Sequence, residues 1–108
     1  MCAYKTLSNN EDGYVIQCEG CDHIQVAFGT TSMTFTQDQF YDHIKVVDES
    51  YNIHNLHAFR DQKCITIPTV ARTLSLVYSV NELKKLLKLL IKGRNSLEHH
   101  KLYEFNEN

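Results

Sequence analysis

Two cysteines at positions i and i+3, in the stretch QCEGCDHIQVAFG, have the clearest chemistry in this sequence. A C-x-x-C pair can hold a metal ion, form a disulfide, carry out redox chemistry or supply two buried thiols. Cys18 and Cys21 are expected at a tight turn containing Gly20, with a strand on each side. This is the arrangement of a zinc knuckle, whose backbone amides point at thiolate sulfurs. Because a redox pair instead starts a helix, the pattern favours a metal clamp.

A third cysteine is expected beside this pair. The stretches YKTL and YVIQ flank the turn-rich SNNEDG and predict a β-hairpin. If Leu7 pairs with Tyr14 in that hairpin, Cys2 lies beside both Cys18 and Cys21. We therefore predict a structural zinc-type site built on these three cysteines.

Several groups are candidates for the fourth ligand of this site. Cys64, at the start of a strand, and His23, just after the pair, are the two candidates, while His54 and His57 are an alternative pair of ligands. A water or an external group would also complete the coordination. Four protein ligands would make the site structural, whereas three would leave a position open for hydrolytic chemistry.

The first half of the chain predicts three strands and then a helix. Residues 14–18, 24–28 and 33–35 show the alternation of a half-buried strand. Thr36 and Gln39 follow as a capping box, in which each side chain bonds the backbone amide at the other position. The buried stripe of the helix is expected to contain Phe40, His43 or Ile44, and Val47.

The second half has the same order. Residues 65–67 and 74–78 alternate as strands, and Ser79 and Glu82 form a second capping box before a stronger helix. An offset of 43 residues aligns the two caps, so the segments 11–50 and 54–94 are candidate repeats of a βββα unit. The alternative is that any strand-to-helix junction selects a cap and an apolar stripe. The stripe expected in this helix contains Leu83, Leu86, Leu87 and Leu90.

The expected fold is α+β, with one antiparallel sheet of about five to seven strands and two helices on one face. Residues 1–94 are expected to form a single domain, with the helix ending at Gly93 and a polar extension over 95–108. Residues 48–62 have no clear period and are expected as a loop or weak strand. A sheet with apolar residues on its other face needs a partner, so we expect a homodimer.

The length and the composition of the chain indicate one globular domain. The chain has 108 residues, of which 43% are hydrophobic and 22% charged. Its start shows no basic segment leading into an apolar run, and Lys88 interrupts the most apolar stretch. We therefore expect no signal peptide, no membrane span and a cytoplasmic location, where thiols stay reduced.

The charges are divided between the halves. Residues 1–50 hold two Lys and eight Asp or Glu, a net −6, and residues 51–108 have a net +4. The halves could attract each other, or the basic half could meet an anion such as nucleic acid. Lysine is also the usual residue of a solvated helix face, and the overall charge of −2 disfavours a nucleic-acid partner. The candidate anion-binding residues on the second helix are Lys84, Lys85, Lys88 and Lys92.

Several stretches resemble a family of small uncharacterised bacterial proteins. They are the initial cysteine, DGYVIQCEGCDHIQVAFG, FTQDQF, IPT and SLVYSVNEL, and the resemblance extends to about Ile91. It implies a compact α+β domain with an N-terminal Cys and a QCxxC…AFG motif as its signature. It implies no known activity.

The function expected from sequence is that of a small non-enzymatic domain with a structural zinc-type site, acting by binding or assembly. Anion binding through the lysine stripe is the first alternative, and a small metal-dependent enzyme with an open coordination position is the second. No metalloprotease, hydrolase-triad or phosphate-loop motif occurs in the sequence.

Overall fold

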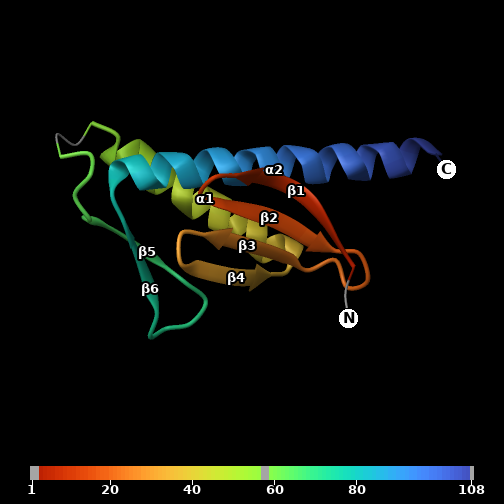
Figure 1. Cartoon of the computed structure of the whole chain (residues 1–108), viewed down its shortest axis with the longest axis horizontal. Helices are drawn as coiled ribbons and strands as arrows, with labels where there is room; N and C mark the ends of the chain where they lie inside the picture. The colour runs from red at the N-terminus through yellow and green to blue at the C-terminus, as the bar shows by residue number, and fades with distance from the viewer. Residues whose placement is uncertain (1–2, 57–58, 108) are drawn as a thin grey trace.

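The computed structural model describes residues 3–56 and 59–107. Within them, strands and helices follow one another in the order ββββαββα, as Figure 1 shows. The strands are β1 (Tyr4–Asn10), β2 (Gly13–Cys18), β3 (Ile24–Phe28), β4 (Thr31–Phe35), β5 (Ile65–Pro68) and β6 (Ser75–Tyr78), and the helices are α1 (Gln37–His54) and α2 (Val80–Glu107). The predicted α+β class is confirmed.

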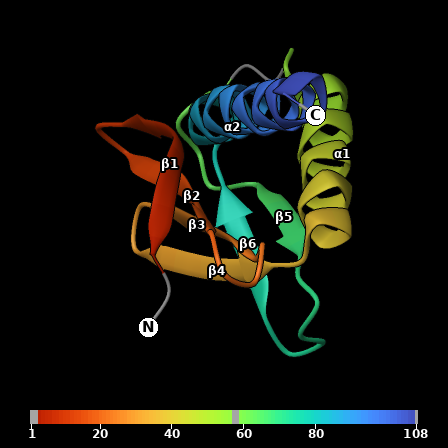
Figure 2. The ribbon, with the colours of Figure 1, turned by 90° about the vertical axis from the view of Figure 1, so that its right-hand side faces the viewer.

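The strands form two sheets rather than one. Strands β1 to β4 make an antiparallel sheet in chain order, while β5 and β6 pair only with each other. The main sheet therefore has four strands, fewer than the five to seven predicted. The physical reason is that β5 packs against α1 instead of joining the edge of the main sheet at β4. Figure 2 shows both helices on the same side of the four-stranded sheet, as predicted.

One core draws side chains from all eight elements. The stripes predicted for the two helices are confirmed, since each of their residues is buried. The β5–β6 pair joins the same core, where the rings of Phe28 and Tyr78 meet edge to face at 6.0 Å. The largest fully buried side chains include Val15, Ile24, Val26, Phe40, Val47, Ile65, Ile67, Leu83, Leu86 and Leu90.

The β1–β2 hairpin is confirmed, but its register differs from the predicted one. Tyr14 pairs with Asn9, two residues beyond the predicted Leu7, and the register shifts by one residue between Thr6 and Ser8. A bulge of this kind turns two successive side chains toward the core. Leu7 and Ser8 are accordingly both buried.

Helix α1 is longer than predicted. The capping box at Thr36 is confirmed, with the Gln39 amide 3.2 Å from the Thr36 hydroxyl and the Thr36 amide 3.0 Å from the Gln39 side chain. The helix then continues to His54 through residues for which a loop or weak strand was predicted. The half-buried Tyr51 packs against the core and supplies the tertiary contact that favours this last part of the helix.

Helix α2 does not end at Gly93 as predicted but continues to Glu107. Beyond Gly93, Leu97 is buried in the core, at 2% exposure. A β-carbon at Gly93 would lie 3.0 to 3.2 Å from carbon atoms of Val15 in β2. Glycine therefore serves here as a contact residue that lets the helix approach the sheet.

We predict that Gly93→Ala lowers the free energy of unfolding by about 1 to 2 kcal/mol, as overpacking of a full core does. The intrinsic helix preference of alanine would act in the opposite direction. Urea unfolding measures the difference, with Asn95→Ala, at an exposed position of the same helix, as the control. A stabilised Gly93→Ala variant would contradict this packing.

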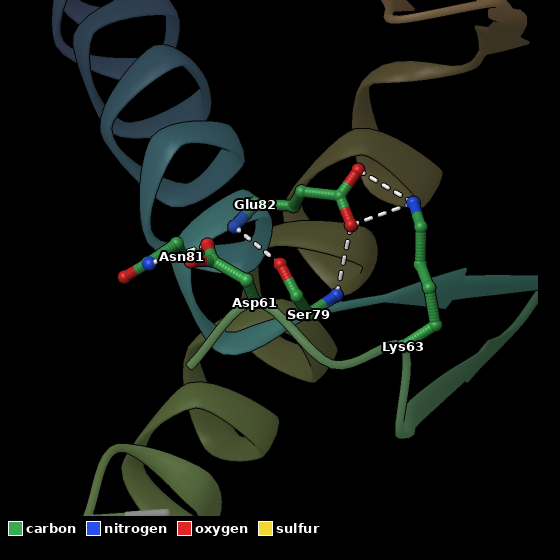
Figure 3. A network of polar contacts seen from close by, with 5 residues as sticks. All are labelled: Asp61, Lys63, Ser79, Asn81 and Glu82. Atoms are coloured by element: carbon green, nitrogen blue, oxygen red, sulfur yellow. Dashed lines mark hydrogen bonds and ion pairs between the residues drawn. The ribbon is translucent and has the colours of Figure 1, made fainter. Parts of the chain in front are cut away.

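Polar contacts cap the start of α2 and join it to the segment before β5, as Figure 3 shows. The second capping box is confirmed, with the Glu82 amide donating to the Ser79 hydroxyl at 3.1 Å and the Ser79 amide donating to the Glu82 carboxylate at 2.9 Å. Lys63 forms an ion pair with Glu82 at 2.6 Å. The Asn81 amide group donates to Asp61 at 2.8 Å, so the segment before β5 is held to the helix.

The two halves are only partly alike. Both capping boxes form at the 43-residue offset, each directly after a strand. Before α2, however, the described residues contain two strands where a βββα repeat predicts three.

Among the described residues, no helix has both the length and the apolar character needed to cross a membrane.

Candidate functional site

The C-x-x-C pair lies in the turn between β2 and β3, as predicted. The Cys18 amide donates to the His23 carbonyl at 2.9 Å, and the Asp22 amide donates to the Cys18 carbonyl at 2.9 Å. The Cys21 amide points at the Cys18 sulfur, 3.4 Å away. An amide in this position stabilises negative charge on sulfur, so the turn has the hydrogen bond expected of a metal knuckle.

The N-terminal strand lies beside this turn. Tyr4 pairs with Cys18, and the Glu19 amide donates to the Ala3 carbonyl at 2.8 Å, which extends the β1–β2 pairing by one residue. Ala3, directly before β1, therefore lies beside the start of the turn. Cys2 itself lies outside the described residues, so its place in the site stays a prediction.

The sulfur of Cys18 is disulfide-bonded, and the residue is only 1% exposed. A sulfur in a disulfide does not act as the thiolate ligand that zinc requires. A disulfide at Cys18 and the predicted metal site therefore exclude each other. The metal prediction concerns the reduced chain.

The two candidates for the fourth ligand precede strands of different sheets. His23 is exposed directly before β3. Cys64 has a free, exposed thiol just before β5, in the second sheet, where its amide donates to the Tyr78 carbonyl at 3.2 Å. Within residues 3–56 and 59–107, no three His, Cys, Asp or Glu side chains form a group that could hold a metal. Any set that includes Cys2 or His57 lies partly outside these residues and stays untested.

The lysine stripe lies on the exposed side of α2. Three of its four residues border a hollow of about 210 Å³ together with the β1–β2 turn, which contributes Glu11 and Asp12. These carboxylates offset part of the positive charge that an anion would meet there. Anion binding by the stripe stays a prediction. The three lysines are Lys85, Lys88 and Lys92.

A second candidate site was not predicted from the sequence. It is a hollow of about 320 Å³ between β4, α1 and residues 68–74, and we call it the His43 hollow. His43 lines it and is 7% exposed, with its ring stacked on Phe35 at a centroid distance of 5.0 Å. Its Nε2 atom is buried without a hydrogen-bond partner among the described residues.

Burial lowers the pKa of His43 from 6.5 to about 4, because the charged imidazolium loses its hydration inside the protein. Asp42 is the other ionisable side chain among the described residues that line the hollow. The ring is therefore neutral near pH 7. The sequence carried one signal of this site, a histidine among the apolar residues of the α1 stripe.

We predict that His43 makes the protein less stable in acid. The unfolded chain takes up a proton near pH 6.5, while folded His43 stays neutral down to about pH 4. The free energy of unfolding therefore decreases as the pH is lowered from about 6.5 to about 4, by up to about 1.4 kcal/mol per pH unit. Urea unfolding at pH 7 and pH 5 measures the slope, which should be smaller in His43→Phe.

The matched control for this experiment is His99→Phe, because His99 is exposed on α2. This variant should keep the pH slope of the parent. Equal slopes in the parent and in His43→Phe would show that His43 is not held neutral by the fold.

The fold and these two sites define a small α+β domain, with a four-stranded antiparallel sheet, a separate hairpin and two helices on one side. The chain belongs to the family of unknown function DUF6686, whose model matches residues 1–108. The resemblance seen in the sequence is thus confirmed as membership of an uncharacterised family. The cysteine signature and a bacterial source stay predictions. No curated protein and no solved structure matches the chain.

Proposed function

We propose that this protein is a non-enzymatic binding or assembly domain of the cytoplasm. In its reduced state, the N-terminal corner holds a structural zinc-type ion. The ligands are Cys2, Cys18 and Cys21 together with a fourth group. The observation that carries the proposal is the Cys21 amide directed at the Cys18 sulfur across the turn.

The turn supports this role because it is already shaped for thiolates. Its two backbone hydrogen bonds join Cys18 to Asp22 and to His23 and so define the shape of the turn. Asp22 has a φ of 62°, in the left-handed region that tight turns use and that aspartate tolerates. Preorganisation of this kind lowers the entropy cost of bringing ligands together.

The disulfide at Cys18 makes the proposed metal site dependent on reduction. A dithiol reductant supplies two electrons and two protons, which convert the disulfide into two thiols. The thiols of the ligand cysteines would then give up their protons to bind a zinc ion as thiolates. When bound, the ion would cross-link the N-terminal segment and the β2–β3 turn. Its role would be structural and not catalytic.

Assembly is supported by the face of the main sheet that points away from the helices. Tyr4 and Tyr14 lie there with exposed fractions of 52% and 37%, and Ile16 and Ala27 are half-buried beside them. These apolar side chains are the part of the face that a second copy of the chain would cover. A homodimer through this sheet face is the form of assembly that we propose.

We expect close to one equivalent of zinc per chain in protein purified under reducing conditions without added metal. Mass spectrometry of the metal and a thiol count on the same sample measure it. The Cys18→Ser variant should lose the metal and unfold more easily. Less than about half an equivalent in the parent, with no loss of stability in the variant beyond the roughly 1 kcal/mol of an ordinary substitution, would contradict the proposal.

Two controls make this result specific. The parent protein kept oxidised should bind no zinc until a reductant is added. Cys64→Ser and His23→Ala identify the fourth ligand, because the one that loses its metal supplies that ligand. If both keep their metal, the remaining ligand comes from His54, His57 or an external group, and the variants become controls for Cys18→Ser.

A further inference from the structure

We propose that the His43 hollow binds a small neutral aromatic alcohol. The hydroxyl of the ligand bonds to the imidazole of His43, and its ring lies against the apolar wall of the hollow. This inference does not depend on the cysteine corner, which involves other elements of the fold.

The hollow has the size and lining of a small-ligand site. Its volume of about 320 Å³ lies at the lower end of the range for such pockets. Three separate parts of the chain form its walls, so it is a feature of the tertiary fold. Its apolar wall contains Met33, Phe35, Val46, Pro68 and Leu74.

His43 is the polar group that this wall surrounds. A buried nitrogen without a partner destabilises the protein, and a hydrogen bond from a ligand would remove that cost. The stack on Phe35 fixes the plane of the ring. Rotation by 180° about the Cβ–Cγ bond preserves this plane and exchanges the positions of nitrogen and carbon atoms at its edges. Because Nε2 is buried in this conformation, the proposed hydrogen bond requires such a rotation of the His43 side chain.

The chemistry of the hollow selects a neutral hydroxyl compound. A hydroxyl both donates and accepts, so it pairs with either tautomer of a neutral imidazole. No lysine or arginine is among the described residues of the lining, and Asp42 repels anions. An aromatic ring fits beside Phe35 and His43, where a second stacked or edge contact is available.

One wall of the hollow is formed by the segment between β5 and β6. Thr69 organises this segment, because its hydroxyl contacts the Ala71 carbonyl at 3.0 Å and the Leu74 carbonyl at 2.8 Å. Val70 and Leu74, which both line the hollow, are 76% and 50% exposed. Exposed apolar side chains in the lining favour an apolar ligand, because they lose contact with water when it binds.

The test compares three probes of similar size by NMR titration of the full chain: phenol, toluene and benzoate. We expect phenol to bind several-fold more tightly than toluene, since one neutral hydrogen bond distinguishes them, and benzoate not to bind. Chemical-shift changes should centre on the residues of the hollow, and the imidazole ¹⁵N signals of His43 should move with phenol but not with toluene.

Two variants test the contribution of the His43 hydrogen bond and that of the apolar wall separately. His43→Phe keeps a ring on Phe35 and should lose the preference for phenol, by about fivefold relative to the parent. Leu74→Asp should abolish binding. Val77→Asp is its matched control, because Val77 is 49% exposed on β6 and does not line the hollow. This control should bind phenol as the parent does.

Several outcomes would overturn the proposal. They are equal affinity for phenol and toluene, a preference that survives in His43→Phe, binding of benzoate, and no saturable shift by roughly 20 mM phenol. Phenol affinity that weakens with rising protein concentration, together with a dimer in sedimentation, would assign the hollow to a second copy of the chain.

Discussion

The close packing of α2 on β1 and β2 is the constraint on which the rest of this fold depends. At Gly93 the helix backbone comes so near to Val15 that even a β-carbon would lie only 3.0 to 3.2 Å from the carbon atoms of that side chain. One turn earlier, the buried Ser8 hydroxyl donates to the Leu89 carbonyl at 2.8 Å. The bulge in β1 provides this bond, because it turns Ser8 inward beside Leu7. The helix is thereby held at a fixed depth on the sheet, and the leucines of its stripe fill the space between them.

The anchored start of α2 also determines where the second sheet lies. The Lys63–Glu82 ion pair and the Asn81–Asp61 hydrogen bond hold the chain before β5 to the first turn of the helix. Partial burial alone would raise the pKa of Glu82, but hydrogen bonds from Lys63 and from the Ser79 amide lower it below the usual range, so the carboxylate stays ionised at neutral pH. The β5–β6 hairpin consequently packs against α1 and closes one wall of the His43 hollow.

The two candidate sites make different demands on the protein. The cysteine turn needs only the β1–β2–β3 corner, whose backbone hydrogen bonds are local. Its chemistry depends on whether sulfur is oxidised or reduced, which the surroundings of the protein control. The His43 hollow requires three distant parts of the chain to meet, and its neutral histidine results from burial. One site therefore responds to redox conditions, and the other is shaped by packing.

The sequence by itself determined the features that arise between near neighbours in the chain. The capping boxes at Thr36 and Ser79, the β1–β2 hairpin and the buried helical stripes all follow from residues within a few positions of one another. It also identified the turn that carries Cys18 and Cys21, because a glycine-containing C-x-x-C between two strands has a local geometry. Tertiary structure alone decided the bulge at Leu7, the split into two sheets, the continuation of α2 through Gly93 and the hollow around His43. Each of these depends on what a residue meets across the core, and the spacing of residues along the chain does not contain that information.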